Sequence, residues 1–235
     1  MEISLDEGIG SEDNSVSFNL KDNSKRAAWT IWTIGLVGIS AVTSFLASAL
    51  YIKNIYSETY NTSPNLEDWL EYADYFSSFA WLAAGISFLH WFRRAYSNIQ
   101  GLGLHTKHTD GWAVGYFFIP IVAWVKPYTI MDEIIRAHWL TLPSISETVD
   151  YDSRKSTMNV WWILFLMTGS FEGVIQIGIN YLVTTNLPWL HLITLAIPRL
   201  IEIAAVLAAV YLVQNISNEE KLLYQHSSKA SPFIH

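Results

Sequence analysis

The chain has 235 residues, a formal net charge of −7 and 15% charged side chains, whereas soluble domains carry about 25%. Hydrophobic residues make up 51% of it, and charges are absent or rare in residues 27–52, 75–92 and 158–214. Apolar runs of about 20 residues match the thickness of a bilayer core. The composition therefore excludes a soluble globular enzyme and predicts an all-α integral membrane protein.

The cysteine count and the net charge exclude further classes of protein. Without cysteine the chain forms no disulfide, no thiolate metal site and no thiol nucleophile. A nucleic-acid-binding protein needs a basic face, and a net charge of −7 argues against one. The expected partners are the lipid bilayer and either a second copy of the chain or another membrane protein.

The chain divides into a membrane domain, residues 27–214, and two flanking tails. Residues 1–26 are acidic, rich in Ser and Asn and without apolar periodicity, which predicts a disordered tail. Residues 215–235 form the second tail. Within the membrane domain four stretches are predicted to span the bilayer: about 27–52, 70–92, 158–183 and 189–214.

The distribution of Lys and Arg orients these spans. If the N-terminus is cytoplasmic, the inner segments 1–26, 93–157 and 215–235 hold twelve of the 14 basic residues. The outer segments then hold only Lys53. Because basic residues concentrate on the cytoplasmic side, both termini are predicted to be cytoplasmic.

Tryptophan placement gives a second expectation about the membrane. Interfacial aromatic belts form at the two faces of a bilayer. Five tryptophans fall near the inner ends of the predicted helices: Trp29, Trp32, Trp91, Trp161 and Trp162. Trp81 lies far from either end and is predicted to fill the bundle core.

Residues 111–140 are predicted to form a helical hairpin that does not cross the membrane. The uncharged run 111–125 is short for a membrane span and contains Pro120 in its middle. Pro127 then interrupts the helix a second time. After Pro127 an amphipathic helix is expected, with an Asp132–Arg136 pair on its polar face. If residues 111–140 crossed the membrane, basic residues later in the chain would move to the outer side. The element is therefore expected to be re-entrant or interfacial, on the cytoplasmic side.

Ten residues before and within this hairpin form a distinctive pattern of aromatic, Gly, Pro and polar side chains: Trp91, Arg94, Asn98, Gly111, Trp112, Gly115, Phe118, Pro120, Pro127 and Glu133. This pattern resembles domain-of-unknown-function family 4328, a group of bacterial multi-pass membrane proteins. Ala123 replaces an Asn that the family usually carries. The resemblance implies the bacterial inner membrane and a helical fold, and it assigns no catalytic residue.

Two roles are expected for polar and small residues of this motif. Gly111 and Gly115 are four residues apart, a spacing that allows close helix approach. Arg94 and Asn98 lie one turn apart and are expected to satisfy carbonyls that the Pro120 break leaves free.

Three charged residues are predicted to meet inside the membrane: Glu172, Arg199 and Glu202. Glu172 and Arg199 lie at equal depth in the last two spans, and Glu202 is one turn from Arg199. A lone intramembrane charge is costly, so pairing is expected. The cluster is either a structural clasp or part of an ion path.

No catalytic, cofactor or metal motif accompanies this cluster. His105 and His108 have only Asp110 nearby, and we interpret them as a solvated loop. The sequence therefore predicts neither an enzyme nor a cofactor. Two functions remain: a non-enzymatic membrane subunit or scaffold, and an ion or small-solute channel or transporter that uses the buried charges.

Overall fold

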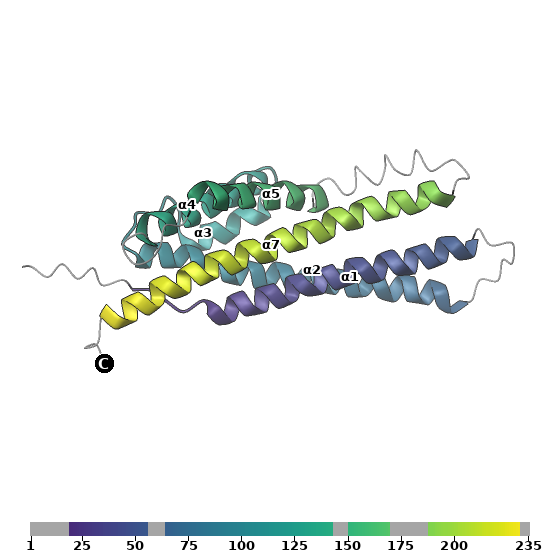
Figure 1. Ribbon diagram of the computed structural model, residues 1–235, viewed down its shortest axis with the longest axis horizontal. Coiled ribbons are helices and arrows are strands. Elements are labelled where there is room, and N and C mark those ends of the chain that lie inside the picture. The colour runs from purple at the N-terminus through teal and green to yellow at the C-terminus, as the bar shows by residue number, and fades with distance from the viewer. Residues whose placement is uncertain (1–18, 56–63, 143–149, 170–187, 231–235) are drawn as a thin grey trace, which may run out of the picture.

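The computed structural model describes residues 19–55, 64–142, 150–169 and 188–230, and every regular element in these ranges is helical. Three long helices run side by side: α1 (Ser24–Ile55), α2 (Pro64–Gly101) and α7 (Pro188–Ala230). Helix α1 packs against both α2 and α7 (Figure 1). The all-α prediction is thus confirmed for the described residues.

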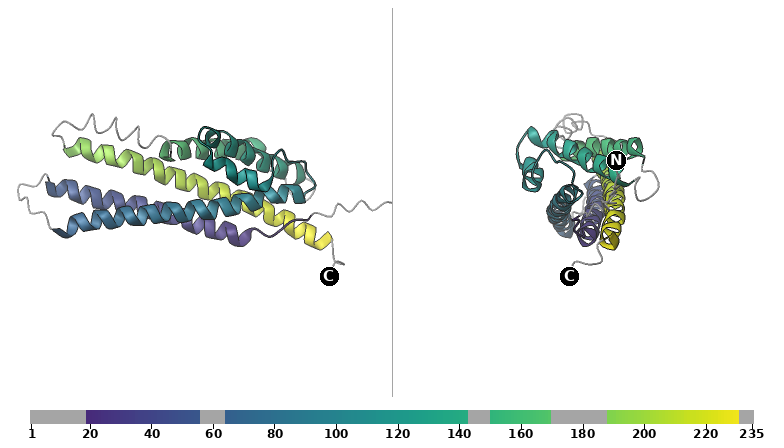
Figure 2. Two further views of the ribbon diagram at one scale, coloured as in Figure 1. Left: turned by 180° about the vertical axis from the view of Figure 1, so that it is seen from behind. Right: turned by 90° about the vertical axis from the view of Figure 1, so that its left-hand side faces the viewer.

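Shorter helices gather along one half of this bundle, near the end where α2 finishes (Figure 1). They are α3 (Asp110–Gly115), α4 (Lys126–Thr141) and α5 (Tyr151–Gly169), with 3-10 turns η1 (Tyr116–Phe118) and η2 (Val122–Trp124) between α3 and α4. Seen along the bundle, they form a second layer over the long helices (Figure 2). Helix α5 packs against α7 and α4.

Local chemistry explains where these elements begin and end. Thr109 caps α3, because its Oγ1 accepts a hydrogen bond from the Trp112 backbone N–H. Pro127 lies in the first turn of α4, where its missing N–H costs nothing. Beyond the end of α2, Gly103 adopts a φ of 74°, a left-handed conformation that favours glycine.

In the described part of the chain two helices are long and apolar enough to cross a membrane, within Ser24–Asn54 and Leu192–Ser228. The predicted spans 27–52 and 189–214 lie in these helices, α1 and α7. The predicted span 70–92 lies within α2, which does not reach the same apolar threshold. The predicted span 158–183 begins within α5, and its second half lies outside the described residues. The four-span count therefore stays a prediction.

The hairpin at 111–140 is sharply bent, as the two prolines predict. The chain bends by 112° between the limbs Asp110–Phe118 and Val122–Thr141. Ile121, in the turn between them, has a φ of 67°, a strained value for a β-branched residue. On α4 the expected apolar face is buried, and it comprises Ile130, Met131, Ile134, Ile135 and Ala137.

Differences from the predicted boundaries arise at both ends of the chain. Helix α1 begins at Ser24, and residues 19–23 are hydrogen-bonded to α2, so the predicted disordered tail 1–26 does not extend to residue 26. Helix α7 continues beyond 214 to Ala230 and buries Ile216 and Leu223 there. In both places, packing against other helices orders residues whose own hydropathy is low.

The five tryptophans of the predicted aromatic belt differ in exposure. Trp29 and Trp32 are exposed on α1, as a belt requires. The other three, Trp91, Trp161 and Trp162, are buried in the bundle core. Sequence position gives the depth of a residue along a helix, whereas the rotation of the helix against its neighbours decides burial.

Candidate functional site

A group of buried and half-buried polar side chains gathers where α2, α4, α5 and α7 meet the N-terminal segment. We call this group the polar network, and it comprises Asn23, Asn98, His138, Arg154, Glu219 and Glu220. The helix α7 supplies its two carboxylates, and four other elements supply the groups that bind them.

The N-terminal segment lies along the end of α2 and is held by backbone groups. The Asn19 N–H donates to the Gly101 carbonyl at 2.9 Å. Asn98 binds Lys21 twice: its Oδ1 accepts from the Lys21 N–H at 3.1 Å, and its Nδ2 donates to the Lys21 carbonyl at 3.0 Å. This pairing holds residues 19–21 extended against α2.

Two amides hold the Glu220 carboxylate. Asn98 Nδ2 donates to one oxygen at 3.0 Å, and Asn23 Nδ2 donates to the other at 2.9 Å. Asn23 Nδ2 also lies 3.3 Å from the Trp91 carbonyl. Because all three side chains are at most 6% exposed, these contacts replace the water that the polar atoms would otherwise bind.

Glu219 joins the second layer to α7. Its oxygens lie 3.1 Å from His138 Nδ1 on α4 and 2.8 Å from Arg154 Nε on α5. Glu219 and His138 are almost fully buried. One carboxylate on α7 therefore connects this helix to both α4 and α5.

The hairpin limbs bind the same stretch of α2. Arg93 Nε lies 2.9 Å from Asp110 Oδ2 at the start of α3. Tyr96 donates its hydroxyl to Glu133 on α4 at 2.8 Å. Burial, helped by that hydrogen bond, raises the pKa of Tyr96 to about 12, so Tyr96 keeps its proton at physiological pH. Both limbs of the hairpin are thus held beside the last turns of α2.

The prediction that Asn98 satisfies free carbonyls at the Pro120 break is wrong. Asn98 binds Lys21 and Glu220 and does not reach the carbonyls at the Pro120 break. Arg94 lies within electrostatic range of Glu220. Trp91, another residue of the motif, is fully buried and donates its indole N–H to Ser217 on α7 at 3.0 Å.

The expected close helix approach at Gly111 and Gly115 is also wrong. A Cβ added at Gly111 meets only its neighbour Thr109, at 4.0 Å, and one at Gly115 meets Trp112 of the same helix. The close approach occurs instead at Gly101, where a Cβ would overlap the backbone carbonyl of Asn19. The motif residues Trp112, Phe118 and Pro120 are exposed, whereas Pro127 is buried at the start of α4.

We expect Gly101→Ala to release the N-terminal segment, since the overlap with the Asn19 carbonyl is with backbone and cannot be relieved by a rotamer change. Hydrogen exchange should show faster exchange of the Asn19 and Lys21 amides. Gly111→Ala is the matched control, because its Cβ has space, and it should leave both amides protected. Equal protection in the two variants would contradict the contact.

Arg199 and Glu202 pair inside the bundle, as predicted. Arg199 Nη1 lies 2.7 Å from Glu202 Oε2, and the other Glu202 oxygen accepts the Trp81 indole N–H at 2.9 Å. Trp81, predicted as a core filler, is thus a polar partner that sequence spacing did not reveal. Glu172, the third predicted member, lies outside the described residues, so the full cluster stays a prediction.

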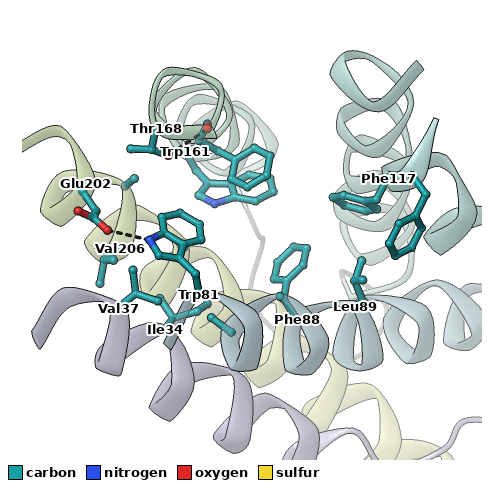
Figure 3. Close-up of a pocket in the computed structure, with 16 residues that line it drawn as sticks. Ile34, Val37, Trp81, Phe88, Leu89, Phe117, Trp161, Thr168, Glu202 and Val206 are labelled. Atoms are coloured by element: carbon teal, nitrogen blue, oxygen red, sulfur yellow. Dashed lines mark hydrogen bonds between the residues drawn. The ribbon is translucent and has the colours of Figure 1, made fainter. Parts of the chain in front are cut away.

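A cavity of about 340 Å³ lies beside Glu202 (Figure 3). Its lining is apolar apart from Glu202 and Thr168, and comes from α1, α2, η1, α5 and α7. Glu202 and Phe117 lie toward its opposite ends (Figure 3). Within the described part of the chain, no group of three or more His, Asp or Glu residues has the geometry of a metal site.

Comparison with known proteins identifies the family. Residues 58–218 match the family described as a domain of unknown function, DUF4328. The match covers more than half of the chain. The chain belongs to the DUF4328 family. No curated protein and no solved structure matches it.

The DUF4328 match places most of the site within the family's own region. Residues 58–218 include Asn98, His138, Arg154 and the Arg199–Glu202 pair. Asn23, Glu219 and Glu220 lie outside it. The polar network therefore joins the DUF4328 region to residues on both sides of it.

Proposed function

We propose that this DUF4328 protein is a multi-pass protein of the bacterial inner membrane, with both termini in the cytoplasm, and that it acts as a non-enzymatic membrane subunit or scaffold. The observation that carries the proposal is that the buried carboxylates Glu219 and Glu220 bind other parts of the fold. Glu219 and Glu220 each bind two partners, which come from α2, α4, α5 and the N-terminal segment. A catalytic group must reach its substrate, whereas these carboxylates hold structural elements together.

Exposed apolar stripes support the placement of three helices in the membrane. On α2 large side chains recur at helical spacing on the exposed surface: Trp69, Tyr72, Tyr75, Phe79, Leu82 and Ile86. This stripe extends about 26 Å at 1.5 Å per residue, close to the hydrocarbon thickness. In water it would form an unusually large apolar patch. It therefore supports α2 as a span alongside α1 and α7.

The tip of the hairpin supports re-entrant or interfacial insertion. Phe118, Ile121, Trp124 and Val125 are exposed around the bend. The tip is fixed at the depth of Phe88, because Phe117 packs on that ring with centroids 6.1 Å apart. Exposed apolar side chains on a bent turn suit burial in the headgroup and acyl boundary.

Cysteine labelling tests this topology, and the chain contains no native cysteine to interfere. Single cysteines at Thr106 and Ser144 should both react with an impermeant maleimide from the cytoplasmic side, because the hairpin enters and leaves on that side. A cysteine at Thr62 should react only from the outside. Opposite-side labelling of positions 106 and 144 would make the hairpin a true span.

Ion and solute flux separates the scaffold from the channel alternative. The channel reading is favoured by one observation, the charged pair Arg199–Glu202 beside a cavity. Purified protein in liposomes should give no flux above empty liposomes if it is a scaffold. Flux that disappears in Glu202→Gln while the variant stays folded would establish the channel reading.

A further inference from the structure

The cavity beside Glu202 lies between α2 and α5, which make few direct contacts with each other. Helices α2 and α5 form opposite walls, and α1 and α7 close the side between them. The two walls approach each other at Phe88 and Trp161, whose ring centroids are 5.7 Å apart. From these rings the space extends toward Trp81 and Glu202 on one side and toward Phe117 on the other (Figure 3).

The polar groups that line the cavity are already hydrogen-bonded within the protein. Both Glu202 oxygens already accept hydrogen bonds, one from Arg199 and one from Trp81. Thr168 donates its hydroxyl to the Phe165 carbonyl. A polar or charged ligand would lose its hydration here and gain few polar partners in return. The lining therefore selects an apolar occupant.

The dimensions and depth of the cavity match one leaflet of a bilayer. On α2 it reaches from Trp81 to Leu89, about 12 Å of helix, and half of a hydrocarbon core is about 15 Å. Trp81 lies midway between Trp69 and Arg93, and Leu89 lies near the cytoplasmic end of the proposed span. The volume also falls within the range of small-molecule sites.

The cavity is continuous with the surface that we place against lipid. Gly85 lines the cavity and is exposed. Its α2 neighbours Leu82 and Ile86 belong to the exposed apolar stripe. A Cβ added at Gly85 would meet no atom within 4 Å, so the wall is open at this position.

We infer that the cavity binds one hydrocarbon chain of a membrane lipid from the cytoplasmic leaflet, which enters beside Gly85. This inference rests on the proposed membrane placement of α2 and α7 and assigns that region a ligand. The chain lies against Phe88 and Trp161 and ends at the Trp81–Glu202 hydrogen bond. Bound lipid joins the walls α2 and α5 through a shared apolar contact.

Photo-crosslinking in membranes tests the site. The probe is a phospholipid with a diazirine on one acyl chain, in vesicles of phosphatidylethanolamine and phosphatidylglycerol that contain the full-length protein. Labelled peptides should include Trp81, Phe88 and Trp161. Gly85→Leu places a side chain in the open space, and the loss of two or three buried methylenes lowers cavity labelling at least about tenfold.

Gly35→Leu is the matched control, because Gly35 on α1 also has no atom within 4 Å of an added Cβ but does not line the cavity. It should label like the wild type. Labelling confined to the exposed stripe, or cavity labelling that persists in Gly85→Leu, would overturn the lipid site and leave the membrane placement intact. No labelling anywhere on the chain would overturn the membrane placement as well.

Discussion

Replacing Arg199 by leucine is expected to lower the free energy of unfolding by about 3–5 kcal/mol, the usual cost of stranding a buried charge. Glu202 is 4% exposed and, among the described residues, would keep only the Trp81 indole as a partner. Membrane surroundings increase the cost of an unpaired carboxylate. Denaturant unfolding of the purified protein in detergent micelles would measure the loss.

Arg136→Leu is the matched control for Arg199→Leu. Arg136 also pairs with a carboxylate on its own helix, Asp132 at 3.3 Å, but its side chain is 57% exposed. Exposed pairs contribute at most about 1 kcal/mol, so this variant should unfold almost like the wild type. Similar losses in both variants would show that the Arg199–Glu202 pair is not buried as described.

The companion change distinguishes a clasp from an ion path. If the predicted Glu172–Arg199–Glu202 cluster is a clasp, Glu172→Gln combined with Glu202→Gln lowers stability. If the cluster is part of a path, the same variant folds normally and loses flux in liposomes.

The second large effect is expected for Asn98→Leu, at about 3 kcal/mol of unfolding free energy. The change removes both hydrogen bonds to Lys21 and leaves Glu220 with one of its two amide donors. A buried carboxylate that loses a donor regains no water. Thermal unfolding in detergent should therefore shift to lower temperature.

A local readout identifies the cause of the Asn98→Leu effect. The Lys21 amide donates to Asn98 Oδ1, so its hydrogen exchange should accelerate in the variant. Gln100→Leu is the control on the same helix, because Gln100 is exposed and binds only Thr106 among the described contacts. Its effect should stay within about 0.5 kcal/mol. A Lys21 amide that stays protected in Asn98→Leu would contradict the described contact.

Features that depend on one helix at a time could be predicted from the amino-acid sequence. Hydropathy located the apolar parts of α1 and α7, and periodicity located α4 with its buried face. Both predicted pairs that the structure contains, Asp132–Arg136 and Arg199–Glu202, join residues three or four positions apart. Such residues are neighbours on any α-helix, whatever surrounds it.

The polar network and the cavity could not be predicted in this way, because they depend on contacts between distant parts of the chain. Asn98 and Glu220 are 122 positions apart, Asn23 and Glu220 are 197 apart, and His138 and Glu219 are 81 apart. The same holds for the burial of Trp91 and the close approach at Gly101. Composition and spacing determine which side chains avoid water, whereas the pairing of distant polar groups depends on which helices become neighbours and on how each is rotated.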